Sequence, residues 1–173
     1  PDMDQLAGYP QANEQGESGL RYALSACAAM DAIQARTAIL AAEKEHGARR
    51  GWLWSRMGQS SLASAVEHLA RLAELSATAP IGNTPAELAA SYQQSGWQVD
   101  DAATQAMGCV HTKADTEAVG SAVRAVYLPW LEEAAKRLQD AMRNVGGLPP
   151  LLEASNLSAN DAGTCTVFVD GLR

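Results

Sequence analysis

Phenylalanine occurs only once in this sequence, and no apolar run approaches the ~20 residues that a transmembrane helix requires. β-Branched residues are sparse until the C-terminal segment, whereas alanine, leucine and glutamate dominate the rest of the chain. This bias favours α-helix over β-sheet. With 173 residues, the chain has the length of one ordinary domain. We therefore expect a mainly α protein without a membrane-spanning segment.

A disulfide framework and an excess of positive charge are also missing. The three cysteines, Cys27, Cys109 and Cys165, are odd in number and far apart, which indicates free thiols in a reducing compartment. The formal net charge of −7 argues against a general nucleic-acid-binding surface, because contacts to phosphates need clustered Lys and Arg. The N-terminus has neither the basic nor the apolar stretch of a signal peptide. We expect a cytoplasmic protein that binds proteins rather than membranes or nucleic acid.

Residues 18–145 carry the helical signals, because apolar residues recur there at steps of three and four. The first helix is expected to run from Ser18, its N-cap, to His46, with Gly47 in the left-handed conformation after its end. Its expected buried stripe is Leu20, Leu24, Cys27, Met30, Ile33 or Gln34, Thr37 and Leu40.

Thr84, Pro85 and Glu87 give a full helix-start signal, with a capping side chain, a first-position proline and an acidic third residue. Ser60 or Ser61 is a plausible cap for an earlier helix, and Asp100 or Asp101 for a later one. We expect these helices over residues 61–76, 85–95 and 101–108.

The longest apolar stripe belongs to the last helix. Pro129 interrupts it, and two interpretations stay open: the helix bends at the proline, or Pro129 is the first residue of a new helix. The chain would thus form a bundle of five or six helices. The stripe consists of Val119, Val123, Val126, Trp130, Ala134, Leu138, Ala141 and Val145.

Four segments are expected along the chain. Residues 1–17 are interpreted as disordered or as a linker, and residues 18–145 as a helical domain. Residues 146–163 form a second linker with one possible helical turn, and residues 164–173 form the first strand of a truncated α/β domain. Because an isolated strand is not stable in water and residue 1 is not methionine, we expect a fragment of a longer protein.

Two tryptophans among three arginines form the least regular stretch of the helical part. Trp52 and Trp54 lie between Arg49, Arg50 and Arg56. This arrangement fits stacking on a single-stranded nucleic acid, but it also fits the commoner packing of a helix corner, with arginine stems covering apolar surface. We favour the second interpretation.

The remaining polar groups of the helical part have ordinary structural interpretations. Cys109 and His111 lack the second pair of a zinc finger. The pairs at 100–101 and 132–133 are interpreted as helix-start charges rather than acid/base groups. His46 is expected at a helix C-terminus, where the dipole favours a partly cationic imidazole. We expect no active site in these helices.

The C-terminal "CTVFVDGLR" is the one stretch that suggests chemistry. Residues 166–169 read as a buried strand, Asp170 follows at once, and then comes Gly171. A strand end holds a carboxylate rigidly, and such carboxylates bind divalent cations at the carboxyl edge of α/β sheets. An ordinary Asp-Gly turn is the alternative. A haloacid-dehalogenase-like or receiver-like start is a third, but the dehalogenase type would favour a second aspartate two residues after Asp170, and position 172 is leucine.

Four segments together resemble the PglZ family: "RRGWLWSRMGQSSLASAVEHLARLAE", "GWQVDDAATQAM", "VRAVYLPWLEEAAKRLQDAM" and "TVFVDGLR". PglZ proteins belong to the alkaline phosphatase superfamily and occur in bacterial BREX phage-defence systems. The resemblance covers residues 20–173. Its helical motifs are specific in combination rather than singly.

The resemblance implies that the chain is a helical spacer or interaction region, followed by the first strand of a metal-dependent phosphatase-like domain. It implies that Asp170 is a ligand of a divalent metal, of the Zn or Mg/Mn class, in the full-length protein. The nucleophile and the other ligands would come after Arg173, so this chain alone is expected to bind no metal and to be inactive. Expected partners are other phage-defence proteins and the missing domains of the same protein. The alternative is a non-enzymatic helical scaffold that docks partner proteins.

Overall fold

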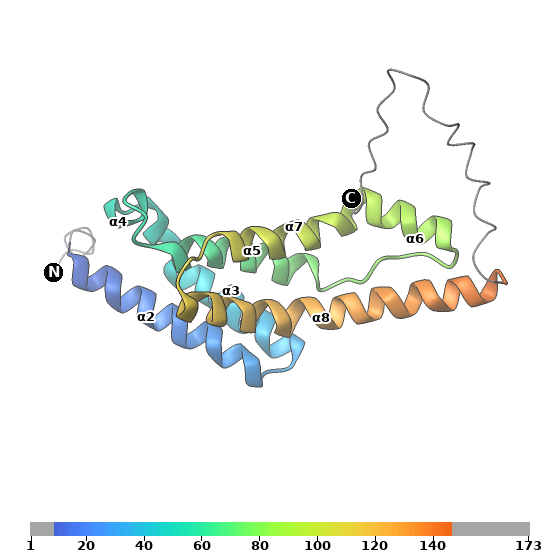
Figure 1. Cartoon of the computed structure of the whole chain (residues 1–173), viewed down its shortest axis with the longest axis horizontal. Coiled ribbons are helices and arrows are strands. Elements are labelled where there is room, and N and C mark those ends of the chain that lie inside the picture. Colours follow the sequence, from blue (N-terminus) through green and yellow to red (C-terminus); the bar gives the residue numbers. More distant parts are fainter. Residues whose placement is uncertain (1–8, 147–173) are drawn as a thin grey trace, which may run out of the picture.

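The computed structural model describes residues 9–146, and every regular element in that range is helical (Figure 1). The expected mainly α class is therefore confirmed. The strand expected over residues 164–173 lies outside the described residues, together with all but the first residue of the linker before it. No helix between residues 9 and 146 is both long and apolar enough to cross a bilayer. The elements are α2 (Pro10–Ala26), η1 (Cys27–Ala29), α3 (Ala32–His46), η2 (Gly47–Gly51), α4 (Leu53–Arg56), α5 (Ser61–Leu75), α6 (Pro85–Ser91), η3 (Tyr92–Gly96), α7 (Trp97–Gly108) and α8 (Lys113–Asn144).

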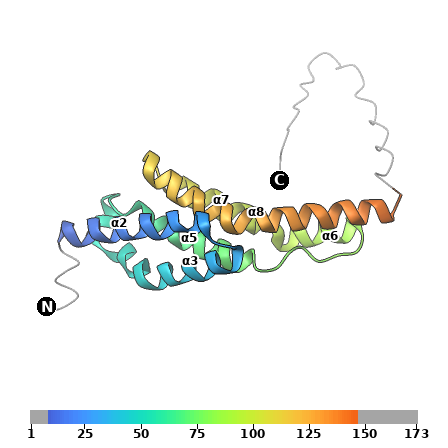
Figure 2. The same cartoon turned by 90° about the horizontal axis from the view of Figure 1, so that it is seen from below.

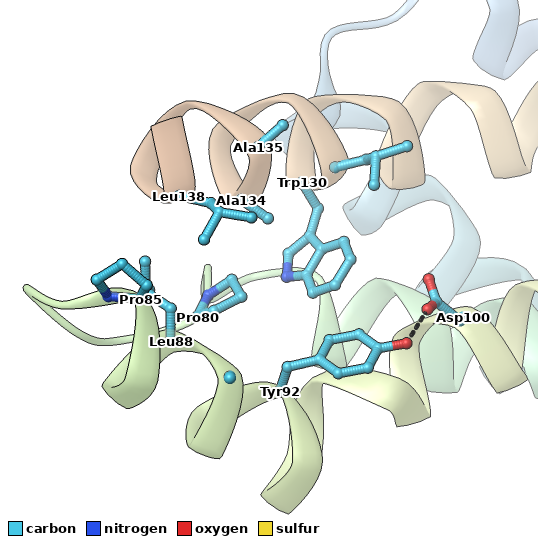
Figure 3. Close-up of a pocket in the computed structure, with 11 residues that line it drawn as sticks. Pro80, Pro85, Leu88, Tyr92, Asp100, Trp130, Ala134, Ala135 and Leu138 are labelled. Atoms are coloured by element: carbon cyan, nitrogen blue, oxygen red, sulfur yellow. Dashed lines mark hydrogen bonds between the residues drawn. The ribbon is translucent and has the colours of Figure 1, made fainter. Parts of the chain in front are cut away.

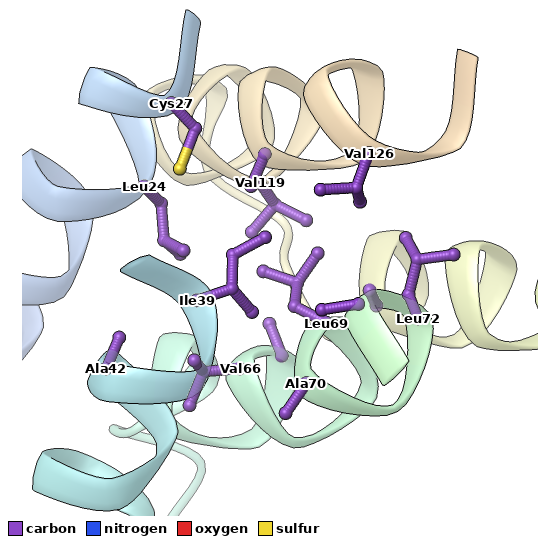
Figure 4. Packing of buried hydrophobic residues seen from close by; sticks show 14 of the residues in the cluster. Leu24, Cys27, Ile39, Ala42, Val66, Leu69, Ala70, Leu72, Val119 and Val126 are labelled. Atoms are coloured by element: carbon purple, nitrogen blue, oxygen red, sulfur yellow. The ribbon is translucent and has the colours of Figure 1, made fainter. Parts of the chain in front are cut away.

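A bundle of α2, α3, α5 and the first half of α8 forms the core, and α7 packs along α5 (Figures 1 and 2). The centre is built from leucine, isoleucine and valine side chains, with alanines between them (Figure 4). Alanine at a contact lets two helix axes approach closely, which explains how a chain with one phenylalanine fills its interior. The largest fully buried apolar side chains are Leu20, Leu24, Ile39, Leu62, Val66, Leu69, Leu72, Val119 and Val126.

The prediction of one first helix over residues 18–46 is wrong in two respects: the helix starts earlier, and the segment forms two helices. Helix α2 begins at Pro10, which has the first-turn position that proline favours, so residues 10–17 are helical rather than a linker. The helix then ends at Ala26, and the chain turns through η1 before α3 begins. Gly47 has a φ of −58° and continues into η2, so it is not a left-handed end residue.

A capping box at Asp31 explains why one predicted helix is two. The Asp31 carboxylate accepts a hydrogen bond from the Gln34 backbone N–H at 2.8 Å, and the Gln34 side chain accepts one from the Asp31 N–H at 3.4 Å. The new helix start shifts the buried positions to Ala35, Ile39 and Ala42. The stripe expected beyond Met30 is therefore wrong, and Ile33 is 74% exposed.

The other helices follow their sequence signals more closely. Helix α5 spans Ser61–Leu75 with its expected apolar face buried, and the Thr84 hydroxyl accepts a hydrogen bond from the Glu87 N–H at the start of α6. Gly96 does not end a helix, because α6 continues through the wide turn η3 into α7. Helix α8 also continues through Pro129, which rules out a new helix start at that residue.

The Asp31 capping box gives a stability prediction. Asp31→Ala removes the acceptor for the Gln34 N–H and is expected to lower the free energy of unfolding by about 1 kcal/mol. Asp31→Asn keeps a capping oxygen and should cost much less. Urea unfolding followed by circular dichroism measures both variants. Equal losses in the two would contradict the role given to the cap.

Candidate functional site

An apolar groove lies between the C-terminal half of α8 and the segment that contains α6 (Figure 3). We call it the α6–α8 groove, and its volume is about 430 Å³. Trp130, Ala134 and Leu138 form its α8 wall. The opposite wall is formed by Pro80, Pro85, Leu88 and Tyr92.

The groove exists because the apolar stripe of α8 is longer than the bundle that covers it. Figure 1 shows α8 extending past α2, α3 and α5, with α6 beside its outer half. The predicted register of the stripe is correct over the bundle, where Val119 and Val126 are fully buried. Further along, Leu138 is 45% exposed and Val145 is 53% exposed. The outer stripe thus has the pattern of a buried surface without a complete cover among residues 9–146.

Two hydrogen bonds fix the loop before α6 against α8. The Trp130 indole N–H donates to the Thr78 carbonyl at 3.0 Å, and the Arg137 guanidinium donates to the Pro80 carbonyl at 3.2 Å. Trp130 itself is only 4% exposed and stacks against Tyr127, with 6.0 Å between ring centroids. The walls of the groove are therefore held in place by contacts that do not depend on a ligand.

Asp100 lies at the inner end of the groove, where its carboxylate accepts hydrogen bonds from two tyrosines. The hydroxyl of Tyr92 donates to one oxygen, and that of Tyr127 donates to the other at 2.6 Å. The helix expected to begin at Asp100 or Asp101 begins instead at Trp97, so neither aspartate is its cap, and Asp100 is a first-turn charge that also joins η3, α7 and α8. Tyr127 is separated from Asp100 by 27 residues, and no local sequence signal links them.

A buried ion pair connects α2 to the segment before α5. The Arg49 guanidinium lies 2.8 Å from the Glu17 carboxylate and also donates to the Asn13 side chain at 2.8 Å. The second Glu17 oxygen accepts the Leu62 N–H at 2.9 Å, at the start of α5. Ser60 donates to Asn13 at 2.7 Å. This cluster explains why the polar residues 10–17 form a helix: Asn13 and Glu17 pair with Nη2 of a buried guanidinium, whose Nε and Nη1 have no hydrogen-bond partner among the described residues.

Trp52 and Trp54 pack at a helix corner, as the favoured interpretation predicted. Both tryptophans are half-buried, and the Arg49 guanidinium lies 5.8 Å from the Trp52 ring centroid. Arg50 pairs with Glu43 and Glu67. Two of the three arginines are therefore engaged with carboxylates and are not arranged as a phosphate-binding surface.

His46 is a half-buried imidazole at the C-terminal end of α3. Burial is the main cause that lowers its pKa, and the Arg49 charge acts in the same direction. Glu45, with its carboxylate 3.7 Å away, only partly opposes this shift. The expected position at a helix C-terminus is confirmed, because α3 ends at His46, but burial shifts the imidazole towards its neutral form.

Among the described residues, Cys27, Cys109 and Glu133 have shifted pKa values with local causes. Burial raises the pKa of the Cys27 and Cys109 thiols, which disfavours the nucleophilic thiolate. Arg137 donates to Glu133 at 2.7 Å and lowers the pKa of that carboxyl, which keeps it ionised on the surface of α8. Among residues 9–146, no three His, Cys, Asp or Glu side chains form a group that could hold a metal. Asp170, the predicted metal ligand, lies outside the described residues.

The Glu17–Arg49 pair gives a second stability prediction. Glu17→Ala leaves a buried guanidinium without its carboxylate and is expected to lower the free energy of unfolding by about 3–5 kcal/mol. Glu14→Ala, on the exposed face of the same helix, should change it by less than about 0.5 kcal/mol. Chemical denaturation measures both. Similar effects of the two substitutions would show that the buried pair is not what holds α2.

The lowered pKa of His46 gives a pH prediction. In the unfolded chain the imidazole titrates near 6.5, so on acidification the unfolded state takes up its proton before the folded state does. The free energy of unfolding should therefore fall as pH drops below about 6.5, through the window down to the lower folded-state pKa. His46→Asn should reduce this fall in urea unfolding between neutral pH and the folded-state pKa. A larger fall in the variant would reverse the sign assigned to His46.

No protein-family model, curated protein or solved structure matches this chain.

Proposed function

We propose that this chain is the helical spacer and interaction region of a larger PglZ-type protein, a metal-dependent phosphatase-like protein of bacterial phage defence. The chain itself would have no catalytic role. The sequence motifs that support this proposal fall on α4 with α5, on η3 with α7, and on α8. The fourth motif contains Asp170 and would begin the phosphatase-like domain.

The α6–α8 groove is the observation that carries the interaction role. A patterned apolar stripe that is only half covered indicates a surface that another segment covers. The stripe also leads directly to the C-terminal end of α8, where the chain continues towards the proposed domain. The occupant that fits best is therefore the later part of the same protein.

In this function residues 9–146 position other parts of the protein and do not take part in catalysis. Their buried carboxylates are paired with arginines, Glu17 with Arg49 and Asp115 with Arg21 at 2.7 Å. Asp100 is likewise engaged by two tyrosine hydroxyls. Groups committed in this way stabilise the packing of helices and are not poised to transfer protons to a substrate.

A non-enzymatic scaffold that docks other phage-defence proteins is the second candidate. The same groove favours it, because an apolar surface of this kind also suits a helix of a separate protein. The two candidates differ in the role of Asp170. Only a phosphatase-like parent requires that carboxylate for metal binding.

The metal role of Asp170 is testable in the longer protein that contains this chain. Asp170→Ala is expected to weaken Zn²⁺ or Mn²⁺ binding by more than about tenfold. Removing a residue that only hydrogen-bonds to a metal ligand already lowers metal affinity by at least about tenfold, and a direct ligand should matter more. Phosphoester hydrolysis should fall with it. Isothermal titration with the metal and a p-nitrophenyl phosphate assay measure the two effects.

Asp140→Ala is the matched control, since Asp140 forms an ion pair with Arg143 on the exposed surface of α8. It should change neither metal affinity nor hydrolysis. Unchanged metal affinity in Asp170→Ala would remove that residue from the site and would favour the scaffold function.

A further inference from the structure

We propose that residues 148–152, Leu-Pro-Pro-Leu-Leu, fold back along the end of α8 and occupy the α6–α8 groove. This inference rests on the proposed function, in which the groove is a docking surface, and it names the segment that docks. The chain between the helical region and the proposed phosphatase-like domain would then be anchored rather than free.

The chemistry of the groove fits this segment. Its walls are apolar, and the polar groups beside it are already paired, the Trp130 N–H with a carbonyl and Asp100 with tyrosine hydroxyls. A ligand therefore needs no charge, and residues 148–152 carry none. The two prolines have no N–H group, so fewer backbone donors lose water when the segment is buried. Proline-rich extended segments bind grooves lined by aromatic rings, as Tyr92 and Trp130 line this one.

The geometry of the chain end allows the segment to reach the groove. Helix α8 ends at Asn144, and Gly146 has a φ of +85°, a left-handed conformation that glycine adopts at turns after helices. At 1.5 Å per residue, Leu138 lies ~9 Å and Ala134 ~15 Å back along the helix from Asn144. Residues 147–152 span up to ~20 Å when extended. The leucines of the segment can therefore lie over both groove positions.

Tethering favours this occupant over a second copy of the chain. A segment joined to the groove by a few residues has an effective concentration in the millimolar range. A second copy must instead overcome the mutual repulsion of two chains that each carry a formal net charge of −7. The neighbouring segment of the same chain is thus the favoured occupant at ordinary concentrations.

Methyl NMR on the full 173-residue chain tests the proposal. With leucine methyl groups labelled, nuclear Overhauser cross-peaks are expected from Leu151 or Leu152 to Leu138 and to the Trp130 ring. They should persist on dilution and be absent between chains in a mixed-label sample. A Leu151→Asp/Leu152→Asp variant should lose the cross-peaks and should bind more of a hydrophobic dye, whereas Leu157→Asp should do neither.

Each other outcome overturns the proposal. Absent cross-peaks in the wild-type chain would mean that residues 148–152 do not occupy the groove. Cross-peaks that appear only between chains, together with dimers in sedimentation, would assign the groove to a second copy. Either result leaves the Asp170 metal experiment untouched, so this inference and the proposed phosphatase-like parent fail independently. Circular dichroism checks that the variants, whose substitutions lie outside residues 9–146, keep their helices.

Discussion

The apolar stripe of α8 is longer than the bundle that covers it, and both the core and the groove depend on this difference in length. The first half of the stripe joins α2, α3 and α5 into one core of buried valines, leucines and alanines. Beyond Pro129 the same stripe continues beside α6 and the loop before it. A single helix therefore both closes the core and forms one wall of the groove.

Local signals explain the parts of the fold that the sequence predicted correctly. The apolar face of α5 repeats at helical spacing, and the start of α6 combines a capping threonine with a proline and a glutamate. Both signals lie within one helix, so no distant contact is needed to interpret them. The register of α8 was predictable for the same reason.

Long-range contacts explain the parts that were missed. Residues 10–17 are polar and contain a glycine, yet they are helical because Asn13 and Glu17 pair with Arg49, which lies more than thirty residues later. The break after Ala26 did have a local signal, the Asp31 and Gln34 capping box, but the unbroken apolar spacing outweighed it. The groove could not be predicted either. Periodicity shows which face of α8 is apolar, but it does not show how far along α8 the other helices pack. The tyrosine contacts of Asp100 depend on tertiary structure alone.

The buried Arg49 has a consequence for where this unit may be trimmed. Gly16 packs against its guanidinium so closely that a Cβ at that position would lie 2.5 Å from the Arg49 Cζ, so the cation is enclosed by α2 itself. A recombinant version that starts at Ser18, where the sequence predicts the helix start, would lack Glu17. The buried guanidinium of Arg49 would then have no carboxylate partner from α2. The smallest autonomous unit therefore has to include the first two turns of α2, although their composition resembles that of a dispensable tail.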